Sequence, residues 1–123
     1  MFGGIALRDV NIPQQAKPGS TIEINLTYET WQSNNPNGIG FVHVFDAAGK
    51  HVAQDDHAPA AGSYPTDMWK AGECVRETYM LDIPAAASGE LKVFTGFYTT
   101  DGTRFQTGTQ DNLVPLGVLQ VQP

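Results

Sequence analysis

The chain has 123 residues, of which 41% are hydrophobic, so it suits one folded domain and is too apolar for a disordered chain. It has 7 Lys and Arg against 13 Asp and Glu, and the net charge of -6 repels phosphate backbones and anionic lipids. We therefore expect no nucleic-acid partner. We also expect no direct membrane insertion, because no apolar run approaches the roughly 20 residues that cross a bilayer.

Apolar and polar residues alternate along short runs that Gly, Pro, Asn and Asp interrupt. In the clearest run, residues 21–28, Ile22, Ile24 and Leu26 share one face, which predicts a strand with one buried side. We expect an all-β fold over a single domain, 1–123: a two-sheet antiparallel β-sandwich of immunoglobulin or fibronectin-III type with about eight strands. In chain order, the predicted strands are residues 5–12, 21–28, 39–45, 51–54, 73–83, 91–99, 103–106 and 116–121.

Short motifs follow one another along nearly the whole chain: FVHVFD at 41–46, GSYPT at 62–66, IP at 83–84 and GFY at 96–98. In this order and spacing they resemble the β-sandwich domain at the extracytoplasmic end of bacterial multi-spanning membrane glycosyltransferases and related envelope proteins. The resemblance implies an immunoglobulin-like fold, a prokaryotic origin and an extracytoplasmic location, in the cell envelope or secreted. It also implies an accessory domain without catalytic residues. This sequence differs in carrying no membrane segment.

Histidines and carboxylates gather near the fourth predicted strand and suggest a metal site. The candidate ligands are His51, Asp55, Asp56 and His57, with His43 as a further member. Their spacing matches no specific metal motif, and a solvated strand end that bends at Asp55 explains the same residues without a metal and is the favoured interpretation. Asp55 and Asp56 could instead bind a structural calcium ion together with Asp101 or Asp111, although Asp is also common in turns.

Aromatic side chains near polar loops are the candidates for ligand binding. A sugar ring presents an apolar C–H face that stacks on an aromatic plane, and polar neighbours take its hydroxyl groups. On strand 91–99, Phe94 and Tyr98 face away from Leu91 and Val93. The alternative for the tryptophans is burial, as plugs at the ends of the sandwich. The candidates are Trp31, Tyr64, Trp69, Phe94 and Tyr98.

These observations favour a non-catalytic extracytoplasmic module that binds carbohydrate at the cell envelope. The alternative is an assembly subunit of a fibre, sheath or complex, in which residues 1–4 or 118–123 add a strand to a neighbour. The partner is accordingly a glycan or another protein subunit. We expect no enzyme, since no serine lies in a nucleophile motif and Cys74 has no cationic neighbour in sequence. No cofactor is expected beyond a possible structural ion.

Overall fold

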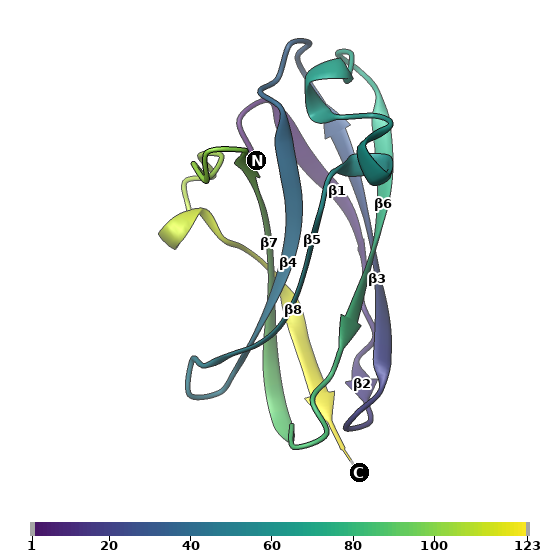
Figure 1. Cartoon of the computed structure of the whole chain (residues 1–123), viewed down its shortest axis with the longest axis vertical. Coiled ribbons are helices and arrows are strands. Elements are labelled where there is room, and N and C mark those ends of the chain that lie inside the picture. The colour runs from purple at the N-terminus through teal and green to yellow at the C-terminus, as the bar shows by residue number, and fades with distance from the viewer. Residues whose placement is uncertain (1, 123) are drawn as a thin grey trace.

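Eight strands form two sheets that pack face to face in the computed structural model, which describes residues 2–122 (Figure 1). One sheet has the order β1-β3-β6 and the other has the order β2-β8-β7-β4-β5. The strands are β1 Ile5–Asn11, β2 Gln15–Ala16, β3 Thr21–Thr30, β4 Gly38–Asp46, β5 His51–His57, β6 Cys74–Asp82, β7 Gly89–Thr99 and β8 Val114–Val121. Three short 3₁₀ turns complete the fold: η1 Pro59–Gly62, η2 Thr66–Met68 and η3 Gln110–Asn112. The predicted all-β, two-sheet sandwich is confirmed.

Alternating side chains place the core between the two sheets. On β3, the predicted inward residues Ile24 and Leu26 are fully buried, and Ile22 is nearly so. Val42 and Val44 of β4 face them from the other sheet and belong to the same buried cluster. Burial of each such side chain contributes about 1.5–3 kcal/mol, so this two-residue period determines which face of each strand points inward.

Three strand predictions differ from the structure. The predicted strand 103–106 is wrong, because only one isolated bridge joins Arg104 to Tyr98. The predicted bend at Asp55 is also wrong, since β5 stays paired with β4 as far as His57. The short strand β2 was missed, and its pairing with β8 is parallel, so the sandwich is not antiparallel throughout. In each case pairing with a distant strand, or its absence, outweighs the local residue pattern.

Both ends of the described chain are already used within the domain. Phe2 is fully buried, and its ring makes edge contacts with Tyr28 at 6.0 Å and Phe97 at 5.3 Å between ring centroids. Residues 118–121 pair with β7 as part of β8. Both segments are therefore built into this domain, and strand addition to a neighbour stays a prediction; Met1 and Pro123 lie outside the described residues.

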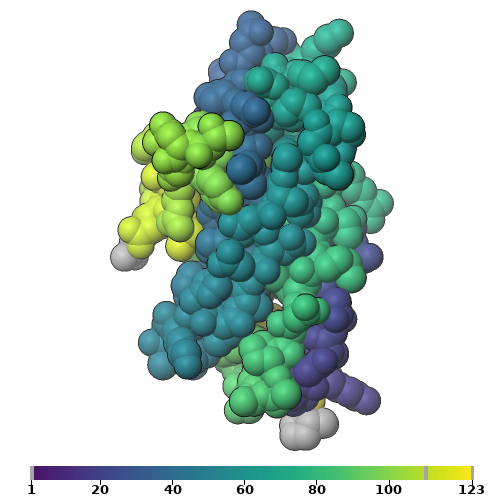
Figure 2. Space-filling model, viewed as in Figure 1, coloured from purple at the N-terminus to yellow at the C-terminus, as the bar shows by residue number. Residues whose placement is uncertain are grey.

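No helix among residues 2–122 combines the length and the apolar character needed to cross a membrane. The residues that the structure describes share one buried core. Figure 1 looks onto the edge where β5 and β6 face each other, with β4 and β7 on one side and β3 and β6 on the other. The segment that follows β7, yellow-green in Figure 2, stands out beside the five-stranded sheet.

Candidate functional site

The five-stranded sheet carries aromatic side chains on the side turned away from the core, here called the outer face. Because Val42 and Val44 point inward, the alternation along β4 sends Phe41, His43 and Phe45 outward. The register pairs His43 with Phe94 of β7 and places Tyr98 on the same face, as the sequence predicted for the last two. The outer face thus presents a stripe of rings where most sheet surfaces are polar.

A pocket of ≈ 530 Å³ opens on the outer face. Its volume lies within the range of roughly 300–1,000 Å³ that is common for small-molecule sites. Its floor contains Phe45 and Phe94, whose rings meet at 73° with centroids 5.7 Å apart. Both rings are half-buried and are held by strands. We call this the outer-face pocket, and its lining residues are Phe45, Gly49, Phe94, Thr109, Asp111, Leu113 and Pro115.

The loop after β7 closes the outer face beyond the pocket. The Arg104 guanidinium lies 5.4 Å from the centre of the Phe41 ring, and its Nη1 donates a hydrogen bond of 2.9 Å to the Asp111 carbonyl. Phe41 is fully buried as a result. A Cβ atom at Gly96 would lie 2.5 Å from Cζ of Phe41, so glycine is what allows the ring to lie across β7. The pocket lies at the other end of the outer face, at Phe45 and Phe94.

Tyr98, predicted to bind a ligand, is partly used within the fold. Its ring stacks on Phe41 with centroids 5.9 Å apart, and its hydroxyl donates to Asp56 Oδ2 at 3.0 Å. The other oxygen of Asp56 lies 3.2 Å from His43 Nε2. Burial lowers the pKa of His43 despite the opposing effect of this carboxylate, so His43 is neutral at neutral pH.

The predicted metal cluster is divided between two faces of the sheet. A register shift pairs Phe45 with His51 but Val44 with Ala53, which leaves Val52 as an extra residue in β5. The bulge turns His51 to the outer face, where its ring lies 5.5 Å from Phe45, although simple alternation places it with Ala53. Asp56 shares this outer face, whereas Asp55 and His57 lie on the opposite one.

Asp55 and His57 form a hydrogen-bond network that joins the two sheets at their edge. His57 Nδ1 lies 3.2 Å from Asp55 Oδ1, and His57 Nε2 lies 3.4 Å from Oε2 of Glu77 on β6. Glu77 is buried and its other oxygen accepts a hydrogen bond from the Ala60 amide, which explains a carboxylate on an otherwise apolar strand face. With a carboxylate at each ring nitrogen, His57 bridges two groups and does not converge with them on one ion.

No group of three or more His, Cys, Asp or Glu side chains that could hold a metal ion occurs among residues 2–122. Two of the calcium candidates, Asp101 and Asp55, hold the fold through hydrogen bonds. Asp101 accepts hydrogen bonds from Thr99 Oγ1 and the Thr103 amide in its own turn, and the Thr99 hydroxyl lowers the pKa of this carboxyl. Asp55 Oδ2 accepts the Met80 amide at 2.8 Å. Asp111 lines the outer-face pocket.

The remaining aromatic candidates lie away from the outer face. Trp69 is 1% exposed and donates its indole hydrogen to the Tyr64 carbonyl, so its prediction as a ligand-binding residue is corrected: its ring is part of the core. Tyr64 is half-buried, and its hydroxyl donates to Glu73. Trp31 is 56% exposed beyond β3, where Arg8 covers its ring at 5.4 Å. The outer face therefore carries Phe94 and Tyr98 but none of the other three.

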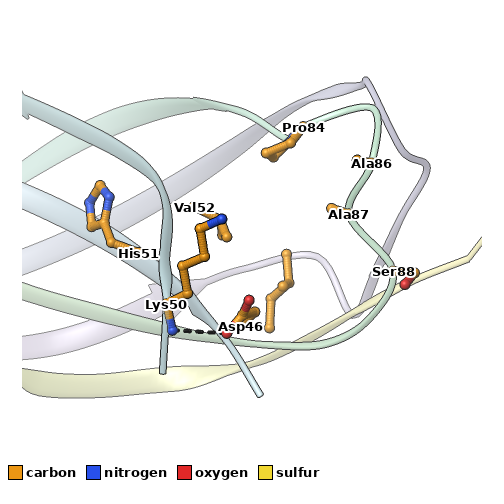
Figure 3. A pocket seen from close by; sticks show the side chains of 9 residues that line it. Asp46, Lys50, His51, Val52, Pro84, Ala86, Ala87 and Ser88 are labelled. Carbon is orange, nitrogen blue, oxygen red and sulfur yellow. Dashed lines mark hydrogen bonds between the residues drawn. The ribbon is translucent and has the colours of Figure 1, made fainter. Parts of the chain in front are cut away.

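A second pocket lies at the end of the sandwich, between the β4–β5 turn and the segment after β6 (Figure 3). It measures ≈ 390 Å³, and its lining combines aliphatic and polar residues: Asp46, Lys50, His51, Val52, Pro84, Ala86, Ala87, Ser88 and Leu91. Asp46 at its rim accepts the backbone amides of Ala48 and Lys50 and so serves the turn. The outer-face pocket has the two aromatic floor rings that this one lacks.

Sequence reasoning missed most of the outer-face pocket. Phe45 could have been found, because it shares a face with His43 in the strand pattern. Thr109, Leu113 and Pro115 come from a loop and from the start of β8, and nothing local in the sequence connects them with Phe45.

The sequence matches no protein-family model and no curated protein. Solved structures do show a similar fold. The C-terminal domain of wzt aligns with 98% of this chain and 74% of its own, at a TM-score of 0.66 and 11% identity. A β-glucosidase from Listeria innocua in complex with glucose aligns with 97% of this chain, which spans only 16% of that enzyme, at a TM-score of 0.63 and 13% identity. A Niemann-Pick type C2 protein from the Japanese carpenter ant gives 0.59 and 9% identity, over 94% of this chain and 91% of its own. At these identities the comparisons show that the chain shares a β-sandwich fold with these proteins.

Proposed function

We propose that this domain is a non-catalytic module that binds carbohydrate in the outer-face pocket. The observation that carries the proposal is the pair of half-buried rings, Phe45 and Phe94, at the floor of a ≈ 530 Å³ pocket. The apolar C–H face of a sugar ring stacks on such a surface. Thr109 and Asp111 line the same pocket. The Thr109 hydroxyl donates to the Leu113 carbonyl, so its oxygen, like the Asp111 carboxylate, would accept a hydrogen bond from a sugar hydroxyl group.

The rigidity of the site supports this proposal. Phe45 and Phe94 come from neighbouring, paired strands, so neither ring has to be ordered when a ligand binds. The net charge of -6 disfavours strongly anionic ligands and favours neutral or basic sugars. A domain of this fold also forms part of a β-glucosidase that was solved in complex with glucose, so the fold occurs in a protein that acts with sugars.

The proposal includes the context that the sequence resemblance implies: an immunoglobulin-like accessory domain, extracytoplasmic, in the cell envelope or secreted. The strand order supports this relationship. Labelled in chain order, β1, β3 and β6 correspond to strands A, B and E of an immunoglobulin domain, and β8, β7 and β4 correspond to G, F and C. Expression with its native flanking sequence and fractionation of the cells tests the location.

The binding proposal is tested first with a glycan array that spans neutral, basic and acidic sugars, and then by calorimetry on the hits. Neither tryptophan lines the pocket, so intrinsic fluorescence is a poor reporter, and amide chemical shifts of residues 92–96 and 109–115 should be followed instead. Phe94→Ala should weaken binding at least tenfold, because it removes one stacking ring. Phe94→Leu, which keeps apolar volume without an aromatic face, should weaken it nearly as much.

The matched control is Trp31→Ala, which removes an exposed aromatic ring next to the three-stranded sheet. This variant should bind like the native protein. Native protein that binds nothing on the array would refute the function, whereas binding that survives Phe94→Ala in a protein of native thermal stability would refute the site.

A further inference from the structure

Two of the three histidines of the chain meet on the outer face, away from every other His, Cys or Glu side chain described above. His43 lies on β4 and His51 on β5, and the bulge at Val52 brings them to the same side. Their ring centroids are 5.2 Å apart, with the ring planes at 89°. We propose that His43 and His51 together bind one divalent transition-metal ion, with solvent in its remaining coordination positions.

The spacing of the two rings suits a shared ion. A metal–nitrogen bond to imidazole is about 2.0–2.1 Å long, so two imidazoles on one tetrahedral ion have ring centroids about 5 Å apart. His51 is exposed, so its ring can turn toward solvent. His43 is held more firmly, with its side chain 13% exposed. One ligand is therefore fixed and the other is adjustable.

His43 is oriented as metal-binding histidines are. A carboxylate normally holds the ring nitrogen that does not bind the metal, and here Asp56 Oδ1 lies 3.2 Å from His43 Nε2. Asp56 is itself held by the Tyr98 hydroxyl. This arrangement places the proton of neutral His43 on Nε2 and leaves the lone pair on Nδ1.

His43 Nδ1 is available to an ion. It makes no hydrogen bond with any residue that the structure describes. It is also accessible, because Tyr28 Oη is the one side-chain polar atom in residues 2–122 that is both buried and without a partner. Neutral imidazole suits copper, nickel and zinc, whereas calcium and magnesium prefer oxygen ligands. The site is accordingly one for Cu²⁺, Ni²⁺ or Zn²⁺.

The experiment titrates the full chain with Cu²⁺ and Zn²⁺ by calorimetry and records the electron paramagnetic resonance spectrum of the Cu²⁺ form. All proteins carry Cys74→Ser, because the exposed thiol of Cys74 would bind or reduce copper by itself. One Cu²⁺ should bind with nitrogen hyperfine structure from imidazole. His51→Ala should weaken binding at least tenfold. Asp56→Asn, which keeps both ligands, should weaken it about tenfold.

The matched control is His57→Ala, which removes the third histidine from the opposite side of the sheet. It should leave the affinity for Cu²⁺ unchanged. Absence of stoichiometric binding, or equal affinity of the native protein and His51→Ala, would overturn the proposal, as would loss of binding in His57→Ala alone. The titration contains no sugar, so its result is independent of the carbohydrate proposal.

Discussion

A substitution at Gly40 tests which face of β4 points into the core. The position of the outer face depends on that orientation. Gly40 and Phe41 are neighbours on β4, so if Gly40 faces inward then Phe41, His43 and Phe45 face outward. A Cβ atom built on Gly40 would lie 2.2 Å from Tyr79 Oη. Since Tyr79 is fully buried, its hydroxyl cannot move into solvent to make room.

We expect Gly40→Ala to lower the free energy of unfolding by about 1–3 kcal/mol, the usual cost of an added methyl group in a packed core. For a domain of this size, that corresponds to a melting temperature lower by about 4–12 °C. In a Tyr79→Phe background the severe clash disappears, because the new Cβ then lies 3.5 Å from the Cζ atom of residue 79, an ordinary contact, and keeps only a tight contact of 3.3 Å with Phe97 Cε1. The same Gly40→Ala change should then cost clearly less than in the native background.

Urea denaturation of the four proteins, followed by the fluorescence of buried Trp69, gives the coupling energy of this double-mutant cycle. The expected coupling is about 1–2 kcal/mol, and it isolates the contact from any separate effect of losing the Tyr79 hydroxyl. Equal costs of Gly40→Ala in the two backgrounds would show that Gly40 does not face Tyr79. The assignment of Phe45 and His43 to the outer face would then be wrong.

Three further predictions concern burial and ionisation. Trp69→Ala should lower the free energy of unfolding, measured by urea denaturation, by about 3–5 kcal/mol, because the Trp69 ring is 1% exposed. Trp31→Ala should lower it by less than about 0.5 kcal/mol, because the Trp31 ring is 56% exposed. Similar losses in the two variants would contradict this prediction. Phe2→Ala should also cost about 3–5 kcal/mol, and a neutral effect would show that the N-terminal segment is not part of the core. Burial raises the pKa of Tyr28 from 10.0 to about 12, so folding favours the neutral phenol. Its contribution to stability is complete below pH 10.0 and is lost as the pH rises through about 12. Denaturation midpoints at pH 9 to 12 should therefore fall less steeply in Tyr28→Phe, and an identical slope would refute this.

The strand pattern was largely predictable, because alternation is a property of consecutive residues. Ile22, Ile24 and Leu26 are buried as their spacing predicts, and Phe94 faces outward for the same reason. In the sequence, Glu77 is the one charged residue on the strand face that it shares with Val75, Tyr79 and Leu81. The sequence could not supply its explanation, the contact with His57 and the Ala60 amide across the edge of the sandwich.

The predicted site residues show where local reasoning ends. The two tryptophans have similar surroundings in the sequence, yet one lies in the core and the other in solvent. Simple alternation would place His51 with Ala53, and this fails because a bulge adds one residue to β5; a bulge depends on how a strand pairs with its neighbour. The sheet therefore separates Asp55 and His57 from the other metal candidates.

From composition and periodicity alone follow the all-β class, the two-sheet arrangement, most strand positions and the outward direction of Phe94. Tertiary structure alone decides that Phe45 and Phe94 share a pocket with Thr109 and Asp111, and that His43 meets His51. The physical reason is that alternation depends on the geometry of a single strand. Pockets and side-chain pairs form between strands and loops whose register depends on the whole packed sandwich.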